Sequence, residues 1–178
     1  MKKILLITIL LLLSIGVFAA PSLSVGVDLV SFDSFYYSNI AIRSEVSCFM
    51  SKDVRFSLPL ALYIETSKNL YLNMANTGLF IDYFPLKDIN FYAGVSLFDY
   101  YYMFGYDRPK NPHFITSSSR LGYILNLGII DFDLRFQILD LVSASQDNAE
   151  ILCDTFGQIT KYKFSIVVSA TFDKKENE

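Results

Sequence analysis

The segment Val54–Glu65 reads VRFSLPLALYIE, and its large apolar residues stand at every second position. Strict alternation of this kind predicts a two-faced β-strand, because successive side chains of a strand point to opposite sides. One face carries Val54, Phe56, Leu58, Leu60, Leu62 and Ile64, and the other carries Arg55, Ser57, Pro59, Ala61, Tyr63 and Glu65. The apolar face meets either the core of a soluble barrel or the lipid around a membrane barrel, and the rest of the chain must decide.

The first nineteen residues have the features of a secretory signal peptide. Lys2 and Lys3 are followed by an apolar stretch over 4–17, and Val17-Phe18-Ala19 supplies small residues at the −3 and −1 positions of a cleavage site. An N-terminal anchor helix is the alternative, but this stretch is shorter than the roughly 20 residues that span a bilayer. We therefore expect a signal peptide over 1–19, one barrel domain over 20–172 and a polar tail over 173–178.

The composition favours a membrane barrel. The chain is 52% hydrophobic and only 19% charged, with 16 Phe, 12 Tyr and no Trp. Beyond the signal peptide it has no apolar run long enough for a membrane helix, and only helices and closed barrels satisfy backbone polar groups in lipid. Removing Lys2 and Lys3 from the 15 basic residues leaves a net charge of −5 against 18 acidic residues. This balance argues against nucleic acid as a partner.

Eight alternating segments follow the signal peptide, and no helical period competes with them. They cover 22–33, 40–49, 54–65, 76–84, 90–102, 116–127, 131–141 and 161–172. Three connections are short (50–53, 85–89 and 128–130), three are long (66–75, 103–115 and 143–160), and 34–39 is intermediate. Short and long connections fall at opposite ends of an up-and-down barrel, as in outer-membrane barrels with short periplasmic turns. The fold class is therefore an all-β, eight-stranded antiparallel transmembrane barrel with both termini periplasmic.

Two further observations predict that the apolar faces meet lipid. Most segments run about nine to thirteen residues, near the roughly 9–11 of membrane-spanning strands and above the 5–6 of soluble ones. Aromatic residues also gather at the segment ends, where amphipathic rings sit at the level of the lipid headgroups. The predicted interface aromatics are Phe35, Tyr36, Tyr37, Tyr83, Phe84, Tyr100, Tyr101 and Tyr102.

The stretch TGLFIDYFPLKDINFYAGVSLFDYY (Thr77–Tyr101) resembles the central hairpin of small outer-membrane barrels of the OmpX/OmpW-like class. In that class a strand ends in an aromatic-Pro turn and the next strand begins with Phe-Tyr-Ala-Gly. The resemblance implies that the last strand carries a signal read by the barrel-assembly machinery, here Ala170 and Phe172. The polar tail after Phe172 departs from the class, whose chains end on the aromatic residue.

Both signs of charge occur on the predicted inward face. The candidate lumen charges are Arg43, Glu45, Arg55, Glu65, Asp82, Arg120, Asp133, Arg135, Lys161 and Lys163, with Asp28 on the same face. Unpaired buried charge is costly, so we expect pairs across the lumen. A plug of paired charges is favoured over a selective polar path, since eight strands leave little open diameter.

Nothing in the sequence indicates catalysis, and we expect no enzyme, cofactor or metal. His113 is the single histidine, in a loop near Asp107 and 117–119. Among outer-membrane barrels, lipid A deacylases use a His-x-Ser pair, but residue 115 is Ile here. One histidine with a remote Cys153 gives no metal-ligand cluster, and we expect Cys48 and Cys153 to remain unpaired at opposite ends.

Three functions remain open. The first is a monomeric outer-membrane barrel with a structural or surface-interaction role, whose partners are outer-membrane lipid, the assembly machinery and an unknown extracellular ligand. The second is a small channel for small or apolar solutes. The third is a soluble periplasmic lipocalin-like barrel, in which the apolar faces would point inward. A last expectation concerns Pro59, which removes a ladder donor in mid-strand and predicts a bulge or local break.

Overall fold

The computed structural model describes residues 22–29, 39–65, 71–86, 89–104, 112–139 and 162–173. The predicted signal peptide, the tail beyond Asp173, the cluster Phe35–Tyr37, Lys161 and Cys153 lie outside these residues, as do the side chains of Glu65 and Tyr71. Within the described residues, no helix is long and apolar enough to cross a membrane.

The described residues form nine strands. They are β1 (Ser22–Asp28), β2 (Asn39–Phe49), β3 (Val54–Glu65), β4 (Tyr71–Tyr83), β5 (Phe91–Met103), β6 (His113–Thr116), β7 (Ser118–Leu127), β8 (Ile130–Leu139) and β9 (Tyr162–Asp173). Strands β6 and β7 lie on either side of Ser117 and both pair with β5, so together they make one strand of the wall. The wall therefore has eight positions.

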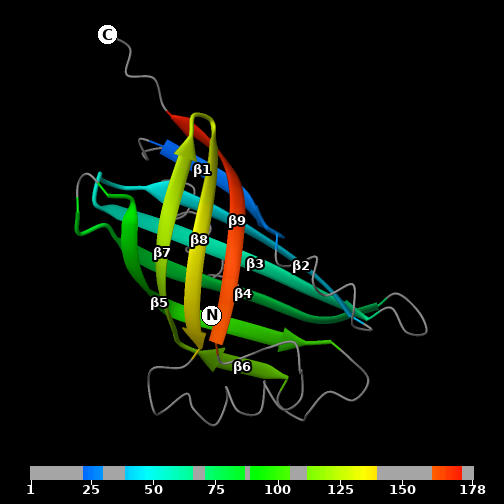
Figure 1. The fold of residues 1–178 in the computed structure, drawn as a ribbon. Helices are drawn as coiled ribbons and strands as arrows, with labels where there is room; N and C mark the ends of the chain where they lie inside the picture. Colours follow the sequence, from blue (N-terminus) through cyan, green and yellow to red (C-terminus); the bar gives the residue numbers. More distant parts are fainter. Residues whose placement is uncertain are drawn as a thin grey trace.

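Every pairing is antiparallel, and the sheet closes on itself (Figure 1). The order is β4-β3-β2-β1-β9-β8-β7-β5-β6, and the additional β4–β5 pairing joins its two sides. Chain neighbours are wall neighbours throughout, and β1 meets β9 where the first and last strands come together. The prediction of an all-β, eight-stranded antiparallel barrel is confirmed.

Three predicted strand boundaries were wrong. Strand β1 ends at Asp28 instead of residue 33, and β4 begins at Tyr71 instead of residue 76. The predicted segment 116–127 begins three residues earlier, at His113, and is interrupted at Ser117. Backbone pairing with neighbours explains the two longer strands, since β4 continues along β3 to Glu65 and β6 pairs with Asp99–Tyr102. Hydrophobic alternation alone does not reveal such extensions.

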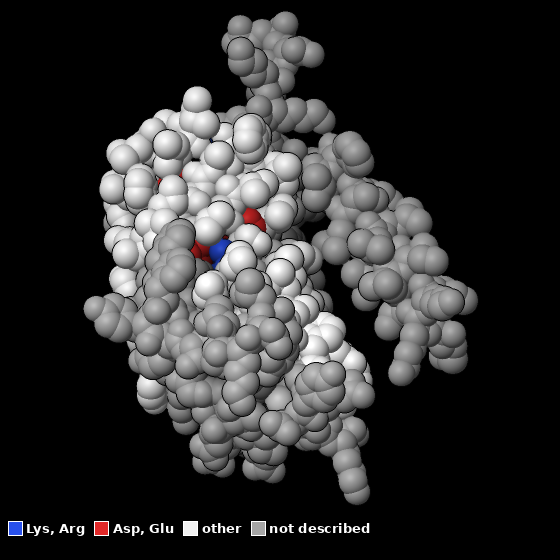
Figure 2. Space-filling view, turned by 90° about the vertical axis from the view of Figure 1, so that its right-hand side faces the viewer, with Lys and Arg blue, Asp and Glu red and all other residues white. Residues whose placement is uncertain are grey.

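The apolar faces of the strands point outward. In β3, Arg55, Ser57, Ala61 and Tyr63 are buried, whereas Leu60 is 44% exposed. The same holds around the wall, where large side chains that remain exposed include Val25, Ile42, Val95, Leu121, Leu134 and Phe164. Figure 2 shows one side of the barrel, where the described surface is mostly uncharged with few acidic or basic atoms. An inward apolar face, as the lipocalin-like alternative requires, is contradicted in these strands.

Pro59 interrupts one of its two ladders. The pairing of β3 with β2 runs through Glu45 and Pro59 without a shift. The pairing with β4 skips Leu58 and Pro59, passing from Ser57 to Leu60, and the Thr77 hydroxyl donates to the Pro59 carbonyl at 3.1 Å. A local break at Pro59 is therefore confirmed on the β4 side, as expected for a residue without an N–H.

A bulge in β5 changes which side chains face inward. Leu79 pairs with Phe98 and Phe80 pairs with Ser96, so Leu97 is an extra residue in β5. Beyond this bulge the alternation changes phase, as expected when one strand gains a residue. Asp99, Tyr101 and Met103 consequently point into the barrel.

The shortest turn connects β7 to β8. Leu127 pairs with Ile130, which leaves only Gly128 and Ile129 in the turn. Gly128 has a φ of 84°, a conformation that glycine adopts without steric cost. This turn and the C-terminal end of β9 lie at the same end of the barrel, at the top of Figure 1. We call it the short-turn end.

Candidate functional site: the charged lumen

The lumen is layered along the barrel axis. At the short-turn end, Phe84, Tyr92 and Ile124 pack together, with Phe49 against them. At the opposite end a larger apolar cluster contains Ala41, Ala61, Tyr63, Met74, Tyr101, Met103, Phe114 and Leu139. Charged and polar side chains occupy the space between these two apolar layers.

Three arginines and three carboxylates form a closed ring in which the signs alternate. Arg120 connects Glu45 with Asp82, Arg55 connects Asp82 with Asp133, and Arg135 connects Asp133 with Glu45. The N–O distances of these six ion pairs lie between 2.6 and 3.0 Å. The members come from β2, β3, β4, β7 and β8. We call this set the alternating ring.

Two contacts in the alternating ring are bidentate. Arg120 donates from Nε and Nη2 to the two oxygens of Asp82, both at 2.7 Å. Arg135 donates from Nη1 and Nη2 to the two oxygens of Glu45, at 2.6 and 3.1 Å. Paired, parallel hydrogen bonds of this kind are the strongest contacts that arginine makes with a carboxylate.

Neighbouring side chains make further contacts with the alternating ring. The Tyr92 hydroxyl donates to Asp133 at 2.7 Å, and the Ser57 hydroxyl donates to Asp82 at 3.1 Å. The guanidinium of Arg55 lies over the Tyr92 ring at 4.4 Å, and that of Arg120 lies over the Phe80 ring at 4.2 Å. The three positive and three negative formal charges cancel, so the alternating ring is neutral. Its members are also buried away from solvent, and Asp82 has no exposed surface.

Glycines at two positions leave room for the ring. A Cβ added at Gly94 would overlap the Asp82 carboxylate, and one added at Gly122 would overlap the Tyr92 ring. Both glycines therefore allow a close approach between the wall and a lumen side chain.

A second charged group lies nearer the other end of the lumen. Lys163 Nζ is 3.2 Å from an Asp28 oxygen, and Arg43 Nη1 is 3.8 Å from the same oxygen. Arg43 also lies 5.7 Å from the centroid of the Tyr63 ring. These side chains retain more exposure than the alternating ring, 14% for Arg43 and 29% for Lys163.

Asp99 is a buried carboxylate that the sequence interpretation missed. It accepts hydrogen bonds from Ser118 Oγ at 2.5 Å and from Asn76 Nδ2 at 3.3 Å. The bulge at Leu97 turns Asp99 inward. In the sequence, this bulge is indicated only by the break of the apolar alternation at Leu97-Phe98-Asp99.

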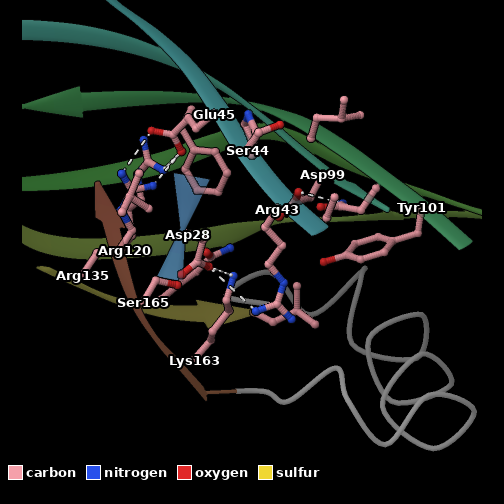
Figure 3. A pocket seen from close by; sticks show the side chains of 18 of the residues that line it. Asp28, Arg43, Ser44, Glu45, Asp99, Tyr101, Arg120, Arg135, Lys163 and Ser165 are labelled. Carbon is pink, nitrogen blue, oxygen red and sulfur yellow. Dashed lines mark hydrogen bonds and ion pairs between the residues drawn. The ribbon is translucent and has the colours of Figure 1, made fainter. Parts of the chain in front are cut away.

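A cavity of about 70 Å³ lies between the alternating ring and the second charged group (Figure 3). Its lining includes Asp28, Arg43, Glu45, Asp99, Lys163 and Ser165. Figure 3 shows the head groups of Arg43 and Lys163 converging beside Asp28. The cavity is far smaller than the several hundred Å³ typical of organic-ligand pockets.

The structure places eight of the ten predicted lumen charges. Six of them make the alternating ring, and Arg43 and Lys163 meet at Asp28. The side chain of Glu65 and the whole of Lys161 lie outside the described residues. Sequence reasoning missed Tyr92, Ser57, Asn76 and Asp99, which are uncharged or out of phase with the assumed alternation.

The predicted interface aromatics divide into two groups. Tyr83 is exposed and Tyr100 and Tyr102 are partly exposed on the outer surface, whereas Phe84 and Tyr101 are buried inside the barrel. An interface position for Phe84 and Tyr101 was therefore wrong. Phe84 directly follows β4, and its side chain packs in the lumen at the short-turn end. The bulge in β5 turns the side chain of Tyr101 from the outer face to the inner face. In the terminal strand, Phe172 is exposed and Ala170 is half-buried. Their role as a signal for the assembly machinery stays a prediction.

His113 lies on the outer surface beside two tyrosines. Its Nδ1 is 2.5 Å from the Tyr100 hydroxyl, and its ring meets Tyr102 edge-on at 5.0 Å. In the described part of the chain, no three His, Cys, Asp or Glu side chains are grouped to hold a metal ion. Cys48 is a free thiol there.

Comparison with known proteins adds no family. No family model matches the chain, and no curated protein and no solved structure has a significant match to it. The barrel and its lumen are therefore the features that bear on function.

Proposed function

We propose that the chain is an integral β-barrel of a bacterial outer membrane, with a closed lumen and a structural or surface-interaction role. In this arrangement both ends of the mature chain lie in the periplasm, and the long connections predicted from the sequence lie at the cell surface. Surface loops on a rigid barrel are natural sites for binding other molecules.

The observation that carries the proposal is the reversed distribution of polarity. The most deeply buried large side chains include Asp82, Asp99 and Asp133, whereas Leu97, Leu127 and Phe164 are more than half exposed. Soluble monomers rarely expose large continuous apolar patches. An outer surface of Val, Leu, Ile and Phe around a polar interior is the distribution of a barrel that faces lipid.

The alternating ring supports the closed lumen. Each arginine contacts two carboxylates and each carboxylate contacts two arginines, so no charged member of the ring is left for a passing ion. The two apolar layers at either end of the lumen add further barriers. These features favour a plugged barrel over the small channel.

Cysteine accessibility tests the lipid-facing surface. In a background with Cys48→Ser and Cys153→Ser, a cysteine is introduced as Leu60→Cys, Ala61→Cys or Lys52→Cys, and the barrel is placed in lipid vesicles. Leu60 is outward and Ala61 inward at the middle of β3, and Lys52 is exposed in the β2–β3 turn. We expect the cysteine at 60 to react with a lipid-soluble maleimide and not with a charged, water-soluble one.

Lys52→Cys provides the matched control, because a turn residue is expected to react with the water-soluble reagent when the vesicles are opened. Rapid reaction at position 60 with the water-soluble reagent, at the rate seen for position 52, would contradict a lipid-facing wall. A chain that stays folded and monomeric without detergent would do the same.

A further inference from the structure

The described part of strand β1 ends beside the cavity, at Asp28. The β1 pairings end at Val27–Ser44 on the β2 side and at Asp28–Val167 on the β9 side. Strand β2 continues to Asn39 and β9 continues to Tyr162, and in this stretch the described pairings of the two strands are with β3 and β8 only. Arg43, Ser165 and Lys163 are the inward residues that flank this stretch.

Charged side chains of both signs line the cavity at this place. Its lining contains four cationic side chains, Arg43, Arg120, Arg135 and Lys163, and three carboxylates, Asp28, Glu45 and Asp99. Glu45 is held by Arg120 and Arg135, and Asp99 accepts from Ser118 and Asn76. Arg43 and Lys163 both lie beside Asp28, so two cationic groups meet at one carboxylate on this side of the cavity.

Three buried polar atoms that belong to lining residues have no hydrogen-bond partner within the described structure. They are Arg43 Nε, Arg135 Nε and Ser165 Oγ. An arginine Nε can only donate, and a serine hydroxyl can donate. Ser165 is 1% exposed, so water outside the barrel does not satisfy it. Buried donors of this kind require an acceptor, because leaving them unpaired is costly.

We propose that this cavity is a binding site for a small anionic group, held by Arg43, Lys163 and Ser165. The cavity volume of about 70 Å³ exceeds the roughly 10–15 Å³ needed for one water molecule, which leaves space for an ion of phosphate size. Two sources supply this chemistry: a dissolved anion such as inorganic phosphate, and the phosphate of a lipid headgroup that reaches the cavity beside Lys163. Binding of a dissolved anion does not depend on the function proposed above, whereas binding of a lipid headgroup rests on the proposed membrane location.

Asp28 gives the proposal a directional consequence. Its carboxylate competes with any anion for Arg43 and Lys163, so Asp28→Asn must strengthen anion binding. Arg43→Gln and Lys163→Gln must weaken it, because each removes one positive charge from the site. A cavity that holds only water has no reason to respond with these opposite signs.

The test measures binding of inorganic phosphate to the barrel in dodecyl maltoside, a detergent without phosphate, by titration calorimetry at constant ionic strength. We expect saturable binding, weakened about tenfold by Arg43→Gln or Lys163→Gln and strengthened by Asp28→Asn. The control is Lys52→Gln, which removes a cation from the exposed turn at the short-turn end. The shift in gel mobility on boiling reports which variants are folded, and Ser165→Ala gives a further variant with no change in charge.

A second arm adds phosphatidylglycerol to the micelles in place of inorganic phosphate. A response to the free ion alone assigns the site to dissolved anions, and a response to the lipid alone assigns it to headgroups. The absence of saturable binding in both arms, or an equal loss in Lys52→Gln, would overturn the site and leave a cavity filled with water.

Discussion

Glu45 shows what a single residue does in this lumen. It accepts from Arg120 at 3.0 Å and from both Nη atoms of Arg135, at 2.6 and 3.1 Å, with little exposure to solvent. Removing one charge from a buried pair leaves its partner uncompensated, and this cost is larger than the net gain from forming the pair. The stability of the alternating ring is therefore a property of the complete set.

We predict that Glu45→Ala lowers the free energy of unfolding by about 3–5 kcal/mol, because Arg120 and Arg135 then share an incomplete set of carboxylates. Glu45→Gln should cost less, since the amide oxygen still accepts one hydrogen bond. The measurement is urea unfolding of the barrel in lipid, followed by circular dichroism.

Asp53→Asn is the matched control for Glu45→Gln, because Asp53 lies in the β2–β3 turn outside the alternating ring. Its effect should stay within about 0.5 kcal/mol, as for surface substitutions in general. If Glu45→Ala costs no more than this control, the ring contributes nothing to stability and the plug interpretation of the lumen fails.

At the scale of the strand, regular alternation was sufficient to predict which face of β3 points outward. Leu60 and Ala61 lie on the predicted sides because the β2–β3 register runs without a shift from Asn39 to Phe49. The six members of the alternating ring were all identified as inward charges for the same reason. Their pairing was beyond prediction, because partners such as Glu45 and Arg135 are 90 residues apart and meet only when the barrel closes.

The second half of β5 shows where the same method fails. FYAGVSL alternates regularly, but the next residues, FDYYYM, are aromatic on both faces and give no phase. The extra residue Leu97 shifts the register against β4, and this shift decides that Asp99 and Tyr101 are inward while Tyr100 and Tyr102 are outward. The position of a bulge depends on pairing with neighbouring strands, so the hydrophobic alternation within one strand does not predict it.

The terminal strand β9 permits a test of the assembly signal. Phe172 and Phe164 are 59% and 55% exposed, and both stand on the outward face of β9. If Phe172 is read by an assembly machinery, Phe172→Ala should lower the amount of barrel in the outer membrane several-fold, without changing its unfolding in detergent.

Phe164→Ala is the control on the same strand and face, with a similar loss of apolar surface. We expect it to assemble normally, as measured by the fraction of protein in the outer membrane that shifts in mobility on boiling. Equal assembly defects in the two variants would assign the effect to lost contact with lipid and remove the special role of Phe172.

For the whole molecule, the important feature is the order of layers along the axis. A solute that crosses the lumen meets the aromatic layer at Phe84 and Tyr92, then the alternating ring, then the cavity, and finally the apolar cluster around Met74 and Phe114. Met74 and Tyr92 have no exposed surface. An eight-stranded barrel is only wide enough for its own side chains to fill. Here aromatic side chains, paired charges and an apolar cluster fill successive parts of the lumen.

Because the layers lie in series, we predict that neither the wild-type barrel nor Glu45→Ala/Arg120→Ala conducts ions steadily in a planar bilayer. The double variant removes one charge of each sign, so the ring region stays neutral while both apolar layers remain. It should unfold at lower urea concentration and still give no conductance steps, with a large-pore porin as the positive control. Steady conductance in the wild type would contradict a closed lumen, and conductance in the double variant alone would identify the alternating ring as the single barrier.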